Sequence, residues 1–487
     1  MMFRFQATNL PRLIIFLTLI VFSLSGCRTT RRMIWYNVPG IADHEIFPSR
    51  SIGRGEKTRT LKSGMVQQFP DLNQWAFGKR YKQGDSAESF FRRTGTIAFL
   101  QLRNDTIIHE FYAEEFNASS TFTTFSLAKV FVSTLVGIAI REGKIRSVEQ
   151  PIAEFLPEFR DPALAEIRIR NLLQMTSGLR SGEKFSNPFN RTVRMYYGAN
   201  LKKATHKPKL KDKPGTKFEY LNLNTQILAQ VLEAATGAPI SEYMQEKIWK
   251  PAGMEADASW SLDREGGMEK AFCCINGLAR DFARFGLLFL QNGMVGSDTL
   301  VGKEWISKAT SLDTANGSHM RYQYSWFTSA EEIDYYGQGL IGQYLYICPT
   351  TNTVIVRLGR KIEFSPWYDM FKFLSGISYL PGKVNMSKSE LLIYEGEYSF
   401  GRSSRGDTSL QGKRVEIIAK QGYLKIKSDF RKTFRTEPES SMLFFNLKEA
   451  RKLKFNFDED QKVESIKWSR RGISWELTPK VREEEGR

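Results

Sequence analysis

The sequence contains little cysteine and little histidine, and this scarcity limits the chemistry open to the protein. Its 487 residues include four Cys and four His, and two of the cysteines, Cys273 and Cys274, are adjacent. A disulfide framework or a Cys/His zinc module needs more of these residues at regular spacings. We therefore expect no metal site, no cofactor, and no fold that depends on structural disulfides.

A long apolar run is also missing, and the one short run indicates export. Leu13–Leu24 follows Arg4 and Arg12 with no acidic residue before it. At about 1.5 Å per residue this run reaches about 18 Å, short of the ~30 Å core of a bilayer, so a signal peptide over residues 1–26 is favoured. A short membrane anchor and an ordinary cleaved signal remain alternatives.

The run ends in Leu24-Ser25-Gly26-Cys27, which resembles the lipobox of bacterial lipoproteins. The resemblance implies cleavage before Cys27 and acylation of this residue, which would anchor the chain in a membrane. We expect a cell membrane or outer membrane lipoprotein that faces the periplasm or the exterior.

Acidic residues are outnumbered, with 53 Asp and Glu against 70 Lys and Arg and a net charge of +17. A net positive charge favours binding to anionic surfaces. An exported protein would meet lipid headgroups rather than cytoplasmic nucleic acid. We expect a membrane partner and no nucleic acid. The sequence indicates no oligomeric state.

Changes in composition divide the chain into segments. Residues 27–84 are polar and contain scattered prolines, and we interpret them as a tether that becomes an N-terminal wrap. Residues 85–382 combine helical and strand-like patterns and form the predicted catalytic domain. Residues 383–487 contain short alternating runs between Gly, Asp and Asn clusters, which indicate a small all-β domain.

The predicted catalytic domain has strands at its two ends and helices between them. Strand-like runs occupy Thr96–Arg103, Thr106–Ala113, Gln343–Cys348 and Thr353–Leu358. We predict an α/β fold of the α+β type, with one antiparallel sheet flanked by helices, an all-helical lobe and a C-terminal barrel-like domain. The expected helices are Ser86–Arg93, Phe125–Arg141, Ile167–Met175, Leu223–Thr236, Leu278–Gln291 and Pro366–Ser375.

Ser126 and Lys129 form a Ser-x-x-Lys tetrad at the start of the apolar helix Phe125–Arg141. Residues three apart share a helix face, so the Lys129 amine can reach the Ser126 hydroxyl near the positive end of the helix dipole. Burial should lower the pKa of Lys129 and let it act as a base. By itself the tetrad is weak evidence, because a capping Ser followed by a solvated Lys has the same pattern.

Two further motifs follow in order. Tyr220-Leu-Asn222 is the only Tyr-x-Asn of the sequence and precedes a predicted helix. Gly337-Gln338-Gly339, with Leu340 after it, leads into the strand Gln343–Cys348. Glycines at such a place let a substrate backbone approach closely. The order of nucleophile with amine, phenol with amide, and Gly-rich strand is that of penicilloyl-type serine enzymes.

With these motifs, residues 86–380 resemble the class C β-lactamase-like and penicillin-binding-protein-like serine hydrolases, and the C-terminal segment resembles a lipocalin-like appendage. The resemblance implies that Ser126 is the acylated nucleophile, Lys129 its base partner and Tyr220 a proton relay. Asn222 would hold the substrate, and the N–H groups of Ser126 and Leu340, beside Gly339, would bind the oxyanion.

The third motif departs from the family, because β-lactamases and peptidases have Lys or His where this chain has Gly337. Neither Gly337 nor the neutral amide of Gln338 can pair with a substrate carboxylate. We expect an acyl-enzyme hydrolase of a small-molecule ester or amide, or of a peptidoglycan-like peptide. The alternative is a catalytically weak penicillin-binding-like protein that binds or senses envelope fragments.

Overall fold

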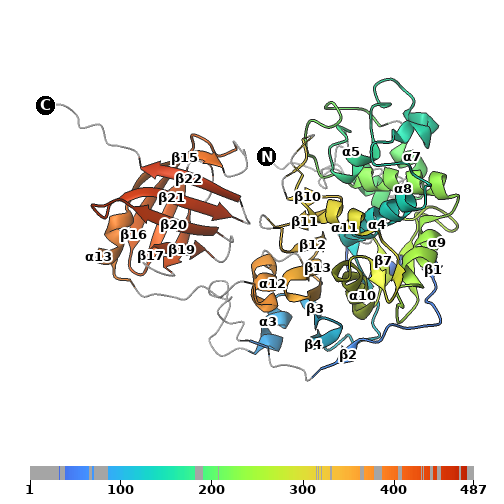
Figure 1. Ribbon diagram of the computed structural model, residues 1–487, viewed down its shortest axis with the longest axis horizontal. Coiled ribbons are helices and arrows are strands. Elements are labelled where there is room, and N and C mark those ends of the chain that lie inside the picture. The colour runs from blue at the N-terminus through green and yellow to red at the C-terminus, as the bar shows by residue number, and fades with distance from the viewer. Residues whose placement is uncertain are drawn as a thin grey trace, which may run out of the picture.

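A computed structural model gives the fold of the protein (Figure 1). It describes residues 32, 39–64, 69–70, 86–180, 190–206, 208–313, 315, 317–319, 321–329, 332–361, 367–377, 386–403, 409–428, 430, 433–438, 442–446, 451–470 and 473–479. The predicted signal peptide and Cys27 lie outside these residues. No helix in the part of the chain so described is long and apolar enough to cross a membrane.

An eight-stranded sheet forms the centre of the larger part of the molecule, in the order β10-β11-β12-β13-β14-β3-β4-β2. Neighbouring strands are antiparallel except for β2, which runs parallel to β4. The strands are β2 (Lys62–Ser63), β3 (Thr96–Arg103), β4 (Thr106–Tyr112), β10 (Tyr322–Gln323), β11 (Trp326–Thr328), β12 (Tyr335–Gly339), β13 (Gln343–Cys348) and β14 (Thr353–Gly359).

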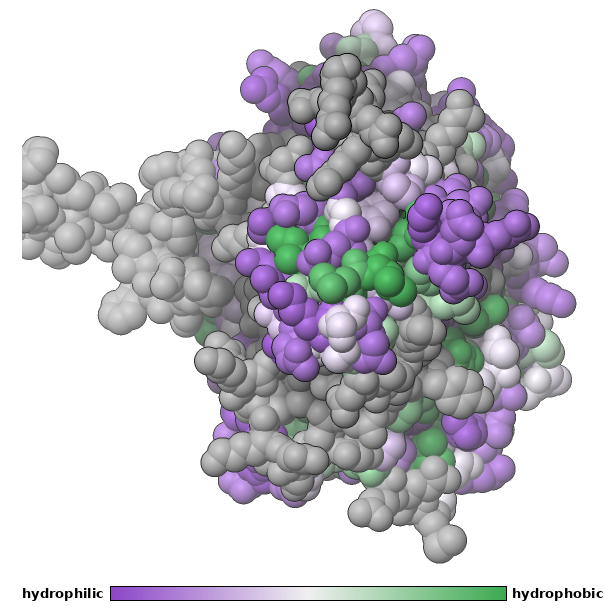
Figure 2. Space-filling model, turned by 90° about the vertical axis from the view of Figure 1, so that its left-hand side faces the viewer, coloured by the Kyte–Doolittle hydropathy of each residue, from purple (hydrophilic) through white to green (hydrophobic). Residues whose placement is uncertain are grey.

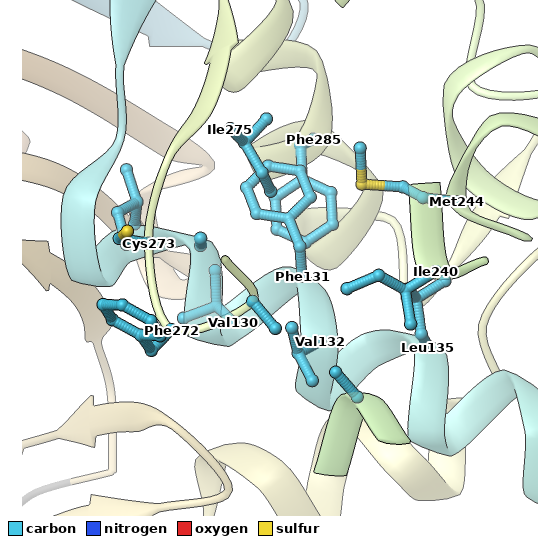
Figure 3. Close-up of a cluster of buried hydrophobic side chains, with 14 of the residues drawn as sticks. Val130, Phe131, Val132, Leu135, Ile240, Met244, Phe272, Cys273, Ile275 and Phe285 are labelled. Carbon is cyan, nitrogen blue, oxygen red and sulfur yellow. The ribbon is translucent and has the colours of Figure 1, made fainter. Parts of the chain in front are cut away.

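Helices cover both faces of this sheet. On one face α3 (Ala87–Arg93) and α12 (Trp367–Ser375) enclose an aromatic cluster that includes Phe91, Phe99 and Trp367. On the other face α4 (Ala128–Arg141) and α10 (Ala279–Leu290) contribute to the main core. Figure 3 shows the ring of Phe131 in α4 against that of Phe285 in α10, and the two rings are stacked with centroids 3.8 Å apart.

The helical lobe lies beyond α4, at the upper right of Figure 1. Its longest helix, α8, begins directly after Tyr220-Leu221 and ends at Gly237, whose left-handed conformation (φ 73°) closes the helix. Besides α3, α4, α10 and α12, the described α-helices before the C-terminal region are α5 (Ile169–Leu173), α6 (Arg191–Tyr197), α7 (Leu201–Thr205), α8 (Asn222–Thr236), α9 (Ile240–Met244) and α11 (Lys303–Thr310).

A second, four-stranded sheet links the N-terminal segment to the centre of the domain. Its order is β1-β6-β7-β5, with β1 (Ser49–Ile52), β5 (Phe122–Thr123), β6 (Ala258–Ser261) and β7 (Ile275–Gly277). The sequence analysis predicted a single sheet and was wrong here, because strands of two to four residues are too short to show an alternating pattern. A separate two-stranded ribbon joins β8 (Met294–Val295) to β9 (Asp298–Thr299).

The C-terminal region is a closed antiparallel barrel, in which β22 pairs with β15. Its interior is filled by apolar side chains such as Phe444, Phe455 and Trp468. Figure 2 faces this side of the molecule and shows apolar surface bordered by hydrophilic residues. The elements are α13 (Lys388–Leu391), β15 (Gly396–Ser403), β16 (Arg414–Lys420), β17 (Tyr423–Ser428), β18 (Phe434–Pro438), β19 (Leu443–Asn446), β20 (Arg451–Phe457), β21 (Val463–Arg470) and β22 (Ile473–Pro479).

The predicted fold class is confirmed: helices flank a largely antiparallel sheet, and an all-β region follows. The helix predicted over Phe125–Arg141 is divided in the structure. A short 3-10 helix, η4 (Phe125–Leu127), precedes α4 and carries Ser126. Phe125, at the start of η4, has a positive φ of 46°, so a regular α-helix cannot include it.

Candidate active site

The turn that carries Ser126 is held in an uncommon backbone conformation. Phe125 lies in the left-handed region, where a side chain with a Cβ atom is strained by about 1–3 kcal/mol. The turn is tied to the small sheet on its N-terminal side, where the Thr124 N–H donates to the carbonyl of Ile275 at 2.9 Å. Ser126 is thus presented on a fixed turn and lines an open pocket.

Lys129 lies one turn further, on the first turn of α4, with its side chain 1% exposed. Its Nζ is 2.9 Å from Ser126 Oγ, 2.8 Å from Asn222 Oδ1 and 2.8 Å from the carbonyl oxygen of Phe272. Asn222 and Phe272 offer only acceptor oxygens to this nitrogen, whereas the Ser126 hydroxyl can also donate. Two N–H bonds and one lone pair on Nζ would therefore satisfy all three contacts.

Tyr220 borders the same group. Lys129 Nζ lies 5.1 Å from the centroid of the Tyr220 ring, which also makes an edge contact with Tyr322 at 5.7 Å. Tyr322 is fully buried, and burial, followed by the charge of Tyr220, raises its pKa well above the usual range, so its phenol stays protonated. Tyr322 is therefore a neutral support behind Tyr220.

The segment before α8 is fixed by the turn around Met175, which has a φ of 58°. The Met175 carbonyl accepts from the Glu219 N–H at 2.8 Å, and the N–H of Gly215 donates to the carbonyl of Thr176 at 2.8 Å. Nearby, a Cβ atom on Gly178 would lie 2.1 Å from the carbonyl oxygen of Asp212, so only glycine fits there. These contacts place Tyr220 and Asn222 at the pocket.

Strand β12 approaches the nucleophile turn through its glycines. A Cβ atom on Gly339 would lie 2.3 Å from the Thr124 carbonyl oxygen, and one on Gly337 would lie 2.5 Å from Leu127 Cδ1. The backbone of β12 therefore packs directly against η4 and the start of α4. This packing also explains why no cationic side chain stands at position 337, since Leu127 fills the space.

The turn after Gly339 is held by hydrogen bonds from a buried arginine, Arg357. Ile341 and Gly342 have φ angles of 57° and 88°, and Arg357 Nη1 donates to the Gly342 carbonyl at 2.7 Å. The same guanidinium donates to the carbonyl of Thr94 at 3.0 Å, and its carbon lies 4.1 Å from the Trp367 ring centroid. Arg357, which is fully buried, thereby positions the backbone around Leu340.

The pocket over Ser126 has a volume of about 480 Å³. No Asp, Glu, Lys, Arg or His is among the described residues of its wall. The wall consists of Pro39, Phe125, Ser126, Thr192, Tyr196, Tyr220, Asn222, Phe272, Cys273, Phe327, Gln338, Gly339 and Leu340. An uncharged ligand fits such a wall without leaving a charge unpaired.

Cys273 and Cys274 form a disulfide between adjacent residues, next to the carbonyl that accepts from Lys129. Both cysteines are buried, and the sequence analysis did not anticipate the bond between them. Cys274 has a φ of 72°, and the Cys273 carbonyl accepts from Trp260 Nε1 at 2.9 Å. Figure 3 shows Phe272 and Cys273 beside Val130 at the start of α4.

The structure brings the residues of the three motifs to one place. Ser126, Tyr220, Asn222, Gln338, Gly339 and Leu340 line the pocket, and Lys129 bonds to two of them. Gln338 is exposed, and its Nε2 donates to the Tyr344 hydroxyl at 3.1 Å.

Sequence reasoning missed several residues of this site. The Phe272 carbonyl is a backbone group that any residue could supply, and the contacts of Arg357 join segments far apart in the chain. Pro39 and Tyr196 line the pocket from regions whose patterns gave no chemical signal.

The chain is similar to several known proteins. Residues 91–361 match the family model described as Beta-lactamase. A 6-aminohexanoate-dimer hydrolase from Paenarthrobacter ureafaciens is 27% identical over 346 residues, which cover 64% of this chain and 82% of the relative. A D-aminopeptidase from Cereibacter sphaeroides is 32% identical over 120 residues, or 23% of this chain and 22% of the relative.

A solved structure shares the fold. It belongs to a Bacillus anthracis protein that is provisionally described as a 6-aminohexanoate-dimer hydrolase. The two structures superpose with a TM-score of 0.59 at 22% identity, covering 68% of this chain and 91% of the other.

Proposed function

Because the chain belongs to the beta-lactamase family, we propose that it cleaves an uncharged ester or amide through an acyl-enzyme on Ser126. Relatives named 6-aminohexanoate-dimer hydrolase and D-aminopeptidase support its assignment as a serine hydrolase of the amide or ester class. The observation that carries the proposal is the contact of Lys129 Nζ with Ser126 Oγ at 2.9 Å inside the pocket.

In the proposed reaction, Lys129 acts as a neutral amine. Its two N–H bonds go to Asn222 and Phe272, and its lone pair accepts the Ser126 proton as Oγ attacks the carbonyl carbon. The resulting oxyanion is held by the N–H groups of Ser126 and Leu340, and removal of one such donor typically costs about 3–4 kcal/mol. Breakdown of this intermediate expels the alcohol or amine, which takes a proton from Tyr220.

Water then completes the proposed cycle. It attacks the Ser126 ester and gives its proton to the Tyr220 phenolate. Collapse of the second intermediate then releases the acid, and Ser126 Oγ recovers its proton from the Lys129 ammonium. The enzyme returns to its starting protonation state, so no cofactor is needed.

The substrate is proposed to be uncharged on the groups beside the scissile bond. The described pocket wall carries no formal charge, and Gly337 stands where Leu127 leaves no room for a cation. A substrate carboxylate bound there would lose its hydration without gaining an ionic partner. We therefore expect neutral esters to react faster than β-lactams and D-Ala-D-Ala peptides, whose carboxylate lies close to the bond.

A fluorophosphonate probe tests the nucleophile. We expect one covalent adduct on Ser126, no adduct in Ser126→Ala, and normal labelling in Ser133→Ala, a buried serine of α4 outside the pocket. Turnover of p-nitrophenyl esters should follow the labelling. If Ser126→Ala is labelled or active like the wild type, the proposed nucleophile is wrong. Absence of turnover together with tight binding of peptidoglycan fragments would instead support the binding or sensing alternative.

We also propose that the protein is held on the cell envelope by acylation of Cys27. The lipobox-like sequence Leu24-Ser25-Gly26-Cys27 supports this proposal. Metabolic labelling with a fatty acid should mark the wild-type protein and not Cys27→Ser. Labelling of both proteins, or of neither, would contradict it.

A further inference from the structure

The helical lobe carries a strongly basic segment over residues 191–217. This segment contains nine Lys or Arg residues and one acidic residue, Asp212, so it supplies +8 of the net charge of +17. Almost half of the excess positive charge of the protein is therefore concentrated in one short stretch of chain, which includes α6 and α7.

Helix α7 directs its two lysines toward the solvent. Leu201 and Thr205 belong to its buried face, and the Thr205 hydroxyl accepts from Gln230 Nε2 of the neighbouring α8 at 2.6 Å (Figure 1). Because this face is fixed against α8, Lys202 and Lys203 lie on the outer side of the helix, and both are exposed.

The chain after α7 is fixed through its backbone. The Arg180 N–H donates to the Lys209 carbonyl at 2.7 Å, and the Lys211 N–H donates to the Gly178 carbonyl at 2.8 Å. The side chains of Lys209 and Lys211 are nevertheless exposed. The positions of these lysines are thus set by the fold, while their ammonium groups remain in contact with solvent.

Most of this positive charge is not neutralised by the protein. Lys211 is paired, because its Nζ lies 2.8 Å from Glu219 Oε2. Five other exposed lysines of the segment form no ion pair within the described part of the chain, and we call them the lysine surface: Lys202, Lys203, Lys209, Lys213 and Lys217.

The lysine surface adjoins the pocket. Thr192 and Tyr196 of α6 line the pocket near the start of the basic segment, and Tyr220 lines it just after the end. Lys217 precedes Tyr220 by three positions, so at most about 11 Å separates their Cα atoms. A partner bound to the lysine surface would therefore lie close to the pocket.

We propose that the lysine surface docks on the anionic headgroups of a phospholipid bilayer. Exposed lysines without acidic partners are attracted to such a surface, and their contributions add. The lysines are spread over a helix and the chain that follows it instead of converging on one point, which suits an extended anionic surface better than a single small anion. The adjoining pocket has an uncharged described wall, and uncharged compounds partition into lipid.

This docking goes beyond the proposed function and depends neither on hydrolysis at Ser126 nor on acylation of Cys27. The acyl chains would bind any bilayer, whereas the lysine surface should bind an anionic bilayer in preference to a neutral one. The preference for anionic lipid is therefore the quantity to measure.

The test measures sedimentation of the full chain with vesicles of phosphatidylcholine alone or mixed with phosphatidylglycerol. Every protein carries Cys27→Ser, so that acylation cannot hold it on the lipid. We expect tighter binding to the anionic vesicles at about 0.1 M salt. The difference should disappear near about 1 M salt, where the Debye length falls from about 10 Å to about 3 Å.

The triple variant Lys202→Gln/Lys203→Gln/Lys209→Gln removes three charges of the lysine surface. Its binding to anionic vesicles should weaken about 100-fold, because each lysine near an anionic membrane contributes about fivefold. Its binding to neutral vesicles should not change.

The matched control is the triple variant Lys144→Gln/Lys303→Gln/Lys308→Gln. These three lysines are also exposed and lie outside the basic segment, so the net charge falls by the same amount. The control should bind anionic vesicles much like the parent protein. Thermal unfolding of both triple variants checks that they fold.

Equal binding of the parent and the Lys202/Lys203/Lys209 variant to anionic vesicles would overturn the inference. Equal losses in both triple variants would also overturn it, because general charge rather than this surface would then attract the lipid. Binding to a soluble polyanion such as heparin, without binding to anionic vesicles, would replace the bilayer by an anionic polymer.

Hydrolysis of a soluble p-nitrophenyl ester without vesicles separates this inference from the proposed function. The rate should be unchanged in both triple variants. Failure of the docking would leave the acyl-enzyme proposal standing, and absence of hydrolysis in the parent protein would contradict the proposed function alone.

Discussion

Replacement of Gly339 by alanine should separate β12 from the nucleophile turn. The new Cβ atom would lie 2.3 Å from the carbonyl oxygen of Thr124 and 3.2 Å from Phe125 Cβ. An ordinary carbon–oxygen contact is about 3.3 Å, so the strand must retreat by about 1 Å. A displacement of this size at a reacting centre lowers the rate by about 100-fold, or about 2.7 kcal/mol in the barrier.

The assay is kcat/KM for a p-nitrophenyl ester together with the rate of fluorophosphonate labelling, and both should fall about 100-fold in Gly339→Ala. Gly302→Ala is the matched control, because its nearest neighbours would be 3.4 Å and 3.9 Å from the new Cβ atom, which are ordinary contacts. Urea unfolding checks that Gly339→Ala is folded. A folded Gly339→Ala variant with wild-type activity would refute the claim that close approach of β12 builds the site.

Three other predictions have defined outcomes. Lys129→Met should fold yet lower the rate of ester hydrolysis by about 100-fold or more, because the proposed base is removed; a variant within a few-fold of wild-type kcat would exclude that role. Glu233 has its pKa raised to about 7, chiefly by burial. Between its ordinary pKa of 4.5 and about 7 the folded state binds more protons than the unfolded state, so stability should fall as pH rises through this window. Glu233→Gln should remove up to about 3 kcal/mol of that decline in urea titrations, and a slope equal to that of the wild type would contradict the argument. Finally, the tryptic peptide 271–280 should lack the two thiol hydrogens of Cys273 and Cys274 until a reductant is added, and a free-thiol mass before reduction would disprove the bond.

The sequence predicted the parts of the site that depend on local spacing. Ser126 and Lys129 are three residues apart, and Tyr220 and Asn222 directly precede or begin α8, so local geometry largely fixes each pair. The longer strands and helices were also predictable, because runs such as β13 have clear periodicity. Their assembly at one pocket followed from the order of the motifs and the family resemblance.

Other features depend on contacts between distant segments and could not be predicted. The positive φ of Phe125 arises where η4 is held between β12 and the small sheet, and nothing in the residues Phe125-Ser126 requires it. The disulfide between Cys273 and Cys274 depends on a loop conformation rather than on spacing. The pocket wall formed by α6 and the N-terminal segment has no sequence motif, because packing there requires only side chains of suitable size and shape.

The place of Pro39 in the pocket wall has a consequence for where substrates are met. Pro39 follows Cys27 by twelve positions. A fully extended chain spans at most about 3.6 Å per residue, so an acylated Cys27 would keep the pocket within about 43 Å of the lipid surface. Compounds that partition into or emerge from that surface would then reach Ser126 at a high local concentration, whereas freely diffusing compounds would gain no such advantage.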